Sequence, residues 1–460
     1  MADTPAAPPP AREGNREGSL EAPTRHPLDW RSDDFYDLAL IEKEMERVFD
    51  ICHGCRRCFN LCDSFPRLFD LVDESPTGEL DGVAKSDYSK VVDACTLCDM
   101  CFMTKCPYVP PHEWALDFPH LMLRARAAER KHEKKRAQSE FLAETDRNGA
   151  IGRLAAPIAN IASARGNLLT RPAMEAALGI AQEAELPKFH TRTFSYRAAL
   201  EPPRRNAEAP ARARKAIIYA TCFVEYNEPH TGQAAQAVLA RQGVETKIVY
   251  PQCCGMPQLE HGDIEAVAAS AAKVSAELAP YIADGWDVIT LTASCGLMMK
   301  FEWPLILPEN EDVRNVSAAA RDICEYVVDI ARKEGLAPGL KPIEGGVTAH
   351  MACHARAQNM GAKSAEMLRL IPDTKVDVLE RCSGHGGTFG VMKETRPLAV
   401  KVGRPAARQA AQKKNETLCS DCPLACKHVG QLIADEFMEI AGASPRRAHP
   451  IELFAEAYGL

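Results

Sequence analysis

Two short stretches of the chain place cysteines at spacings that suit a polynuclear metal centre. CHGCRRCFNLC begins at Cys52 with gaps of two, two and three residues, and CTLCDMCFMTKCP begins at Cys95 with gaps of two, two and four. In ferredoxin spacing, three cysteines of a run wrap one [4Fe–4S] cluster and the fourth ligates the other cluster. The spacing therefore predicts one cluster held by Cys52, Cys55, Cys58 and Cys106, and a second held by Cys95, Cys98, Cys101 and Cys62.

Structural zinc is the alternative for these runs, since CxxC pairs also suit a tetrahedral zinc ion. Two such pairs satisfy one zinc ion, which leaves the third cysteine of each run and Pro107 without an explanation. Two features depart from the usual iron–sulfur pattern: Asp63 follows Cys62 where proline is usual, and one extra residue precedes Cys106. Apolar residues at three- and four-residue intervals in 37–51, and again before Cys95, predict helices that lead into both runs.

Composition favours reduced, metal-bound cysteines over disulfides. The 460 residues include 18 cysteines, and residues 1–27 are rich in Pro, Ala and charge, which predicts a disordered tail without an export signal. No apolar run reaches the roughly 18 residues of a spanning helix. We therefore expect a cytoplasmic protein, where thiols stay reduced. The formal net charge of -8 argues against a nucleic-acid partner.

The sequence of the carboxyl-terminal half predicts a repeated α/β unit. Strand-like runs at 216–220, 245–250 and 286–292 alternate with helical sequence, and each is followed by cysteine. The order recurs about 130 residues later, with offsets of 131, 129 and 124 between matching cysteines. Carboxyl ends of parallel strands meet at one edge of a sheet, where helix amino termini stabilise anions. Two further thiol sites are expected: Cys222, Cys253, Cys254 and Cys295 in the first repeat, and Cys353, Cys382, Cys419 and Cys422 in the second.

Other residues near these cysteines have supporting roles. We expect glycines to let backbone N–H groups approach cluster sulfides, and histidines to be structural or hydrogen-bonding neighbours, because four thiolates already satisfy one cluster. Cys324 lies inside a helical segment and is expected to be a buried structural cysteine, whereas Cys426 is assigned either to the same site as Cys422 or to packing. The glycines and histidines concerned are Gly255, Gly384, Gly386, Gly387, His350, His354 and His385.

The motifs around the repeated cysteines resemble the CCG modules of heterodisulfide reductase-related proteins. The segments that carry the resemblance are CFVEYNEPHTG, QCCGMPQLEHG, TASCGLMMKFEWP, HMACHARAQNMG, RCSGHGGTFG and SDCPLAC. Their order behind a two-cluster ferredoxin module is similar to that of the C-subunit family of anaerobic glycerol-3-phosphate dehydrogenases. Complete modules of this kind offer five cysteines, whereas here Met298 stands in the last thiolate's place and Ser383 breaks the second doublet.

The resemblance implies an iron–sulfur electron-transfer subunit that relays electrons from a flavoprotein dehydrogenase, of the glycerol-3-phosphate dehydrogenase kind, toward a quinone or other acceptor. Such a subunit turns over no substrate of its own and contacts the cytoplasmic membrane face peripherally. Two alternatives stay open: a heterodisulfide or thiol reductase-like catalytic subunit, and an electron carrier for rubrerythrin-type peroxide defence. Interaction modules stabilised by structural zinc ions are the alternative without redox chemistry.

The expected fold class is α plus α/β, with a helical two-cluster ferredoxin module followed by a duplicated α/β cysteine-rich domain. The predicted boundaries are a tail at 1–27, the helical module at 28–135, a helical connector and linker at 136–214, and CCG modules at 215–335 and 336–460.

Overall fold

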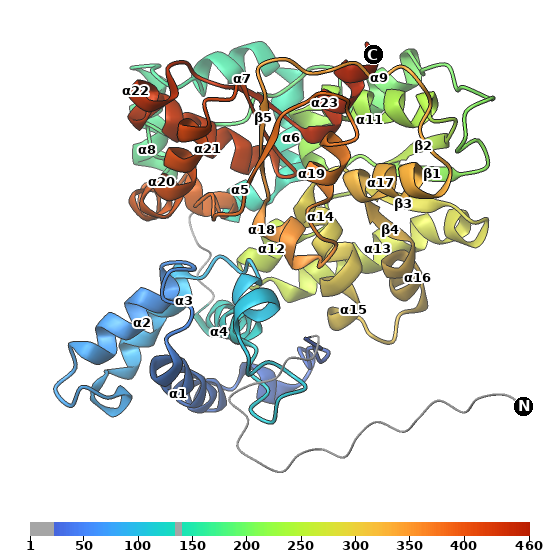
Figure 1. The fold of residues 1–460 in the computed structure, drawn as a ribbon. Coiled ribbons are helices and arrows are strands. Elements are labelled where there is room, and N and C mark those ends of the chain that lie inside the picture. Colours follow the sequence, from blue (N-terminus) through green and yellow to red (C-terminus); the bar gives the residue numbers. More distant parts are fainter. Residues whose placement is uncertain (1–22, 134–139) are drawn as a thin grey trace, which may run out of the picture.

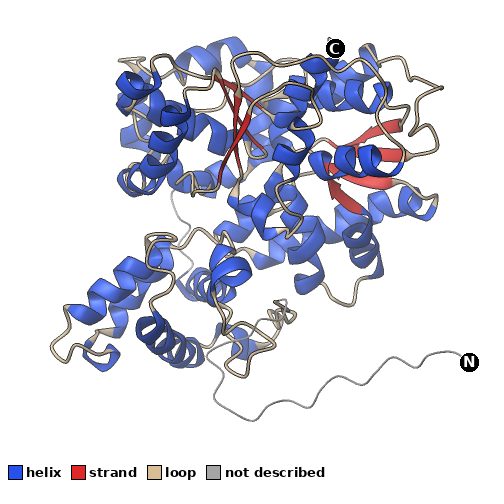
Figure 2. Ribbon diagram, in the orientation of Figure 1, coloured by secondary structure: helices blue, strands red, loops and turns tan. Residues whose placement is uncertain are grey.

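The computed structural model describes residues 23–133 and 140–460. A helical amino-terminal part, drawn in blue in Figure 1, lies beside two α/β units, whose sheets are the two groups of red arrows in Figure 2. Residues 1–22 of the predicted tail, and 134–139 at the predicted boundary between module and connector, lie outside the described residues.

Helix α1 of the amino-terminal part leads directly into the first cysteine run. It begins where the Asp37 side chain accepts hydrogen bonds from two backbone N–H groups, which is a stabilising N-cap. It ends at Arg56, in the left-handed conformation, and its last turn carries Cys52 and Cys55. The helix predicted before this run is therefore confirmed and extends into it. The helices of this part are α1 (Leu38–Cys55), α2 (Ser64–Asp73), α3 (Tyr88–Ala94) and α4 (Phe118–Glu133).

The connector is helical and packs closely on the first α/β unit. On α6, a Cβ at Gly149 would lie 2.2 Å from Tyr226, and one at Gly152 would lie 2.5 Å from Phe189, so only glycine allows these contacts. The helix is thereby fixed beside the start of the first α/β unit. The connector helices are α5 (Glu140–Ala143), α6 (Thr145–Leu154), α7 (Ala156–Ala162), α8 (Thr170–Leu178) and α9 (Phe194–Leu200).

Each α/β unit is built on a four-stranded parallel sheet, with orders β2-β1-β3-β4 and β6-β5-β7-β8. The identical order confirms that the second unit repeats the first. β1 and β5 are central strands covered on both faces, so every residue of β5 and all of β1 after Lys215 are buried. The strands are β1 (Lys215–Tyr219), β2 (Glu245–Val249), β3 (Asp287–Thr290), β4 (Ala320–Asp322), β5 (Val347–His350), β6 (Val376–Leu379), β7 (Thr417–Ser420) and β8 (Arg446–Ala448).

Short helices begin just after several strands, and three of them carry one of the repeated cysteines, Cys222, Cys295 or Cys353. The first unit contains α10 (Cys222–Tyr226), α11 (Pro229–Arg241), α12 (Met256–Glu260), α13 (Ile264–Ala283), α14 (Ala293–Leu297), α15 (Trp303–Ile306), α16 (Glu311–Ala319) and α17 (Ile323–Lys333). The second contains α18 (Cys353–Ala357), α19 (Lys363–Leu368), α20 (Arg396–Lys413), α21 (Pro423–Glu436), α22 (Met438–Ala441) and α23 (Pro450–Tyr458). In the part of the chain that the structure describes, no helix has the length and apolarity needed to cross a membrane.

One hydrophobic core runs through both α/β units. Val224 and Ile289 of the first unit belong to the same buried cluster as Val347 and Phe454 of the second. α23, at the end of the second unit, packs on α11 of the first (Figure 1). The two repeats therefore fold against each other as one body.

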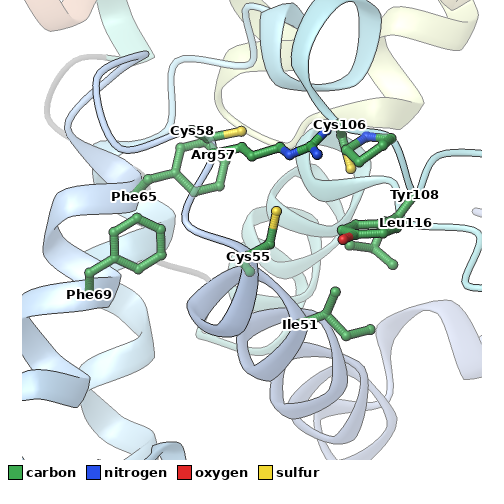
Figure 3. Close-up of a pocket in the computed structure, with 11 residues that line it drawn as sticks. Ile51, Cys55, Arg57, Cys58, Phe65, Phe69, Cys106, Tyr108 and Leu116 are labelled. Atoms are coloured by element: carbon green, nitrogen blue, oxygen red, sulfur yellow. The ribbon is translucent and has the colours of Figure 1, made fainter. Parts of the chain in front are cut away.

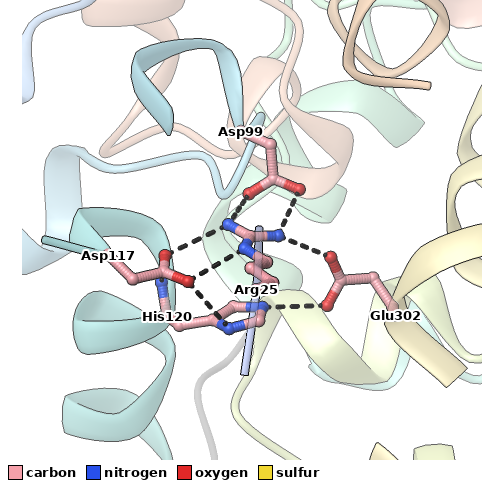
Figure 4. Close-up of polar contacts among 5 residues, drawn as sticks. All are labelled: Arg25, Asp99, Asp117, His120 and Glu302. Atoms are coloured by element: carbon pink, nitrogen blue, oxygen red, sulfur yellow. Dashed lines mark hydrogen bonds and ion pairs between the residues drawn. The ribbon is translucent and has the colours of Figure 1, made fainter. Parts of the chain in front are cut away.

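The predicted tail includes a residue that the structure holds in place (Figure 4). The Arg25 guanidinium forms ion pairs of 2.7 Å with Asp99, 2.9 Å with Asp117 and 2.9 Å with Glu302, and its side chain is 10% exposed. Asp99 and Asp117 belong to the amino-terminal part, whereas Glu302 belongs to the first α/β unit. The tail prediction is wrong at Arg25, because three carboxylates distant in sequence supply its contacts.

Candidate metal centres

The four cysteines predicted for the first centre line one small pocket in the amino-terminal part. Cys52 and Cys55 come from the last turn of α1, Cys58 from the loop that follows, and Cys106 from the second run. In Figure 3 the sulfur atoms of Cys55, Cys58 and Cys106 point toward a common space. Burial, and then the nearness of the other three thiols, raise the pKa of Cys52. The crossing ligand Cys106 therefore reaches the first run, as the spacing predicts.

The four cysteines predicted for the second centre also meet. Burial is the main cause that raises the pKa of Cys62, followed by repulsion from Cys98 and Cys95. The pKa of Cys101 is raised by burial and then by the same two thiols, with smaller effects of Cys58 and Cys62. Because Cys58 belongs to the first group, the two groups of thiols are neighbours.

Both departures from the usual spacing have a structural reason. The extra residue before Cys106 is taken up by one π turn, Cys101–Lys105, which a 2.8 Å hydrogen bond from the Cys106 N–H to the Cys101 carbonyl closes. Asp63, in the place of proline, accepts hydrogen bonds of 2.7 Å from Arg67 and 3.0 Å from Lys401. Lys401 lies on α20, so Asp63 ties the first run to the second α/β unit.

The first α/β unit brings its four predicted cysteines together at the carboxyl ends of its strands. The Sγ atoms of Cys222 and Cys253 are 3.6 Å apart. Cys254 is in hydrogen-bonding contact with the thiols of both Cys253 and Cys295. The contact with Cys222 is the main cause that lowers the pKa of Cys253. Trp303 Nε1 donates a 3.0 Å hydrogen bond to the Cys254 carbonyl and fixes the doublet.

The sequence did not reveal the residues of α6 that complete this site. Asp146 accepts a 2.8 Å hydrogen bond from the Cys253 N–H and another from the Tyr250 hydroxyl. Burial raises the pKa of Asp146. The Thr145 side chain contacts Cys222 and Cys253. No local motif marks these two residues, because only the packing of the connector on the sheet brings them to the cysteines.

Two of the predicted glycines have a steric reason of their own. Gly255 has a φ of +89°, and a Cβ there would lie 3.3 Å from Val267. Gly384 has a φ of +74°, and a Cβ there would lie 2.1 Å from the Ala399 carbonyl oxygen. Left-handed backbone and close packing therefore require glycine at both positions. Their approach to cluster sulfides stays a prediction.

The prediction that Cys419 joins the second thiol site is wrong. Ile289 pairs with Ile218 in the first sheet and Cys419 pairs with Ala349 in the second. Ile218 and Ala349 each lie four residues before the first cysteine of their repeat, so Cys419 takes the position of Ile289. Cys419 is 0% exposed and lies in the shared hydrophobic core. Alternation along the strand turns its side chain toward that core.

The same register changes how the other cysteines correspond. Cys295 lies six residues after Ile289 and Ala425 six after Cys419, so the second repeat has alanine where the first has its last thiol. Met298 corresponds to His428, nine residues after those same strand positions, and is 0% exposed in the core. The Cys422 thiol packs instead against the alanine cluster Ala293, Ala352 and Ala355.

Only part of the fourth predicted group is assembled. Cys353 is in hydrogen-bonding contact with Cys382 and also with Cys98 of the second amino-terminal group. Cys382 also accepts a hydrogen bond of 3.4 Å from the Gly384 N–H. The second unit therefore holds a pair of thiols that touches the amino-terminal part.

The repeated units match a known domain family. A model of the CCG cysteine-rich domain matches residues 216–300 and 347–429. The chain carries two CCG domains. It is 28% identical over 323 residues to the C subunit of anaerobic glycerol-3-phosphate dehydrogenase from Escherichia coli strain K12, which covers 69% of this chain and 76% of that relative. It is 28% identical over 191 residues to lactate utilization protein A of Geobacillus sp. strain WCH70, which covers 39% of this chain and 76% of that relative. The resemblance inferred from the cysteine motifs is confirmed.

The histidines near the CCG cysteines differ in their contacts. His350 uses both ring nitrogens structurally, at 3.0 Å from Ser420 Oγ and 2.9 Å from the Arg381 carbonyl. His354 Nδ1 lies 2.8 Å from Ser294 Oγ, which joins the two domains. His385 Nε2 is buried and has no hydrogen-bond partner in the structure, and burial lowers the pKa of this imidazole to about 3. His350 and His354 thus have the structural roles that we expected.

The donor sets fit [4Fe–4S] clusters at three of the four predicted places. Each of these places offers four thiols, which is the ligand set of such a cluster. At the first of them the four thiols line one pocket. Within 23–133 and 140–460, no group of three or more His, Cys, Asp or Glu side chains is arranged to hold a single metal ion. The fourth place lacks the required donors, because Cys419 is in the core.

Asp421 gives the CCG domains a pH-dependent stability. Burial, and then repulsion by Asp322, raise the pKa of this carboxyl to about 8, against an ordinary value of 3.8. The folded state therefore keeps the proton between about pH 4 and pH 8, whereas the unfolded state loses it. The free energy of unfolding should fall as the pH rises through this interval, by up to about 1.4 kcal/mol per pH unit.

Asp421→Asn should remove this slope, because asparagine does not titrate. Urea midpoints at pH 6 and pH 8, measured anaerobically by circular dichroism, test the prediction. The exposed Glu439→Gln serves as the matched control and should keep the wild-type slope. An unchanged slope in Asp421→Asn would show that Asp421 is ionised in the folded protein.

Proposed function

We propose that the chain is an iron–sulfur electron-transfer subunit of a dehydrogenase and holds three [4Fe–4S] clusters. The observation that carries the proposal is the convergence of twelve cysteines, from five separate stretches of sequence, into three groups of four thiols. The cluster ligands are Cys52, Cys55, Cys58 and Cys106; Cys62, Cys95, Cys98 and Cys101; and Cys222, Cys253, Cys254 and Cys295.

The work of the protein in this proposal is to hold these groups and to set their surroundings. Bound [4Fe–4S] clusters supply one-electron oxidation and reduction. The chain's own residues bury the thiols, exclude water and donate hydrogen bonds near them, which tune the reduction potential. Trp303 and the backbone at Gly255 do this at the first CCG domain, while apolar side chains such as Phe65 and Phe69 line the first amino-terminal site.

The proposed donor is a flavoprotein dehydrogenase, and the proposed acceptor is a quinone or another oxidant at the cytoplasmic face of the membrane. The relative named above is a subunit of a glycerol-3-phosphate dehydrogenase, which supports a dehydrogenase partner of that kind. A catalytic heterodisulfide reductase receives less support, because the second CCG domain lacks a complete set of thiols at its site. A role in peroxide defence would keep the same carrier and change only its partners.

Iron and sulfide quantification of the anaerobically reconstituted chain tests the proposal. Three four-iron clusters predict about twelve irons and about twelve sulfides per chain, with EPR signals of reduced [4Fe–4S] clusters during a redox titration. About eight irons would remove the cluster from the first CCG domain, and a zinc content in place of iron would overturn the proposal.

Replacing one cysteine should lower the iron content when the cysteine lies in the first CCG domain, but not when it is Cys419 of the second. Cys254→Ala should lower the iron content by about four per chain, because the first CCG domain loses one of four ligands. Cys419→Ala should leave the iron content unchanged, because this side chain lies in the core. Iron analysis and EPR of the two variants, prepared side by side, check both. Equal loss of iron in both variants would contradict the strand register as the guide to ligands.

A further inference from the structure

The second CCG domain retains two of the four thiols that the first domain brings together. By strand register Cys353 corresponds to Cys222. By motif, CSG beside CCG, Cys382 corresponds to Cys253, after a loop that is one residue shorter. The Sγ atoms of Cys222 and Cys253 are 3.6 Å apart. Ser383 takes the place of the second doublet cysteine, and Ala425 takes the place of the last one. The domain has therefore lost half of a cluster site and kept two thiols whose counterparts are in contact in the first domain.

This retained pair is in a setting that differs from that of a buried structural thiol. Cys353 and Cys382 are both partly exposed, as is Cys222, whereas the structural cysteines Cys324 and Cys426 are buried. Cys353 is in hydrogen-bonding contact with Cys382, and the Gly384 N–H donates to the Cys382 sulfur at 3.4 Å. The positive charge of Arg356 also stabilises the negative charge of the Cys382 thiolate. A nearby cation and a hydrogen bond from the backbone stabilise a thiolate, which is the reactive form of cysteine.

The pair also touches the part of the chain that carries electrons in the proposed function. Cys353 is in hydrogen-bonding contact with Cys98, whose loop belongs to the amino-terminal part. A cleft of about 750 Å³ lies between the same two parts, lined by Cys95 and Thr96 from one and by Gly386 and Phe389 from the other. Because Cys353 and Cys382 are themselves partly exposed, water and small thiols can approach the pair.

From these observations we propose that Cys353 and Cys382 form a reversible dithiol–disulfide couple, a two-electron redox site beside the Cys98 loop. On oxidation the two thiols lose two protons and two electrons, and one S–S bond forms. On reduction that bond breaks, and each sulfur takes up one electron and one proton. The protons exchange with water at the partly exposed pair. For reduction the electrons come from the dehydrogenase partner, and on oxidation they pass to the quinone or other acceptor; both points rest on the proposed function. In the test, the reduced and the oxidised form of a small dithiol replace the donor and the acceptor.

The test uses the full chain, purified and reconstituted anaerobically. Samples are equilibrated with mixtures of reduced and oxidised dithiothreitol, alkylated, digested and analysed by mass spectrometry. We expect a linked peptide pair that joins Cys353 to Cys382, whose amount rises and falls reversibly with the ratio of the mixture. The iron content should stay constant over this range. If both thiols are alkylated in full at every ratio, the couple does not exist.

Variants separate this couple from a cluster site. Cys353→Ser and Cys382→Ser should each abolish the linked peptide and leave the iron content of the wild type. Loss of about four irons in either variant would identify a cluster ligand and overturn the proposal. Cys422→Ser is the matched control and should keep the linked peptide, because its thiol packs against alanines. Low iron in the wild type together with a normal linked peptide would refute the proposed function alone. The wild-type measurement needs no variant, so a variant that misfolds does not leave the proposal untested.

Discussion

Cys106→Ser is expected to remove about four of about twelve irons per chain and to abolish electron transfer through the subunit. Cys106 lies in the second cysteine run, yet its thiol lines the cavity of the first group beside Cys52, Cys55 and Cys58. A serine hydroxyl is a poor substitute for a thiolate ligand of iron, so we expect that group to lose its cluster. Anaerobic iron analysis, EPR and reduction of a dye acceptor by the complex with its dehydrogenase measure the effect.

Cys426→Ala is the matched control for this experiment. Its thiol is buried on α21 and donates a hydrogen bond to the Leu418 carbonyl at 3.4 Å, away from the three groups of four. We expect its iron content and dye reduction to equal those of the wild type. If Cys106→Ser kept all of its irons, the exchange of ligands between the two runs would be refuted, even though the runs themselves could still bind clusters.

Arg25→Ala is expected to destabilise the contact between the amino-terminal part and the first CCG domain by about 3–5 kcal/mol. The substitution leaves Asp99, Asp117 and Glu302 without their shared cation, and the side chain of Glu302 is only 2% exposed. His120 also lies 3.1 Å from Glu302, but it cannot replace a guanidinium that joins three carboxylates (Figure 4). Uncompensated buried charge is the reason for the large effect.

Urea denaturation and hydrogen exchange measure this loss. The urea midpoint should fall, and the backbone amides of α4 and of 297–306 should exchange faster. Arg31→Ala is the control, since Arg31 and Glu309 form an exposed ion pair, with side chains 59% and 57% exposed. Exposed pairs contribute about 0–1 kcal/mol. Similar midpoints for the two variants would show that Arg25 does not hold the parts together.

The amino-terminal groups were predictable because their ligand pattern is mostly local. Cys52, Cys55 and Cys58 lie within seven residues, and a loop of that length has few ways to arrange three thiols that face one centre. The second run has the same property. Exchange of the fourth ligand is a long-range feature, and the known ferredoxin spacing supplied it. The repeated α/β pattern was also predictable, since alternating strands and helices with recurring cysteines leave one fold class.

The second CCG site was predicted incorrectly because cysteines were matched in order instead of by strand position. Matching the cysteines in order makes Cys419 the counterpart of Cys295. The strand register instead makes Cys419 the counterpart of Ile289. Only the structure shows which face of β7 a side chain occupies, because a shift of one residue reverses it. Arg25 and Asp146 could not be predicted either. Their partners lie in other parts of the chain, and no local pattern marks them.

The core shared by the two CCG domains has a consequence for the end of the chain. α23 belongs to the second repeat, yet it packs on α11 of the first, and the Thr231 hydroxyl donates a hydrogen bond to the Glu452 carboxylate. Deleting residues 450–460 would thus expose the apolar face of a helix that was synthesised more than 200 residues earlier. During synthesis on the ribosome, the first repeat cannot complete its packing until α23 has been made.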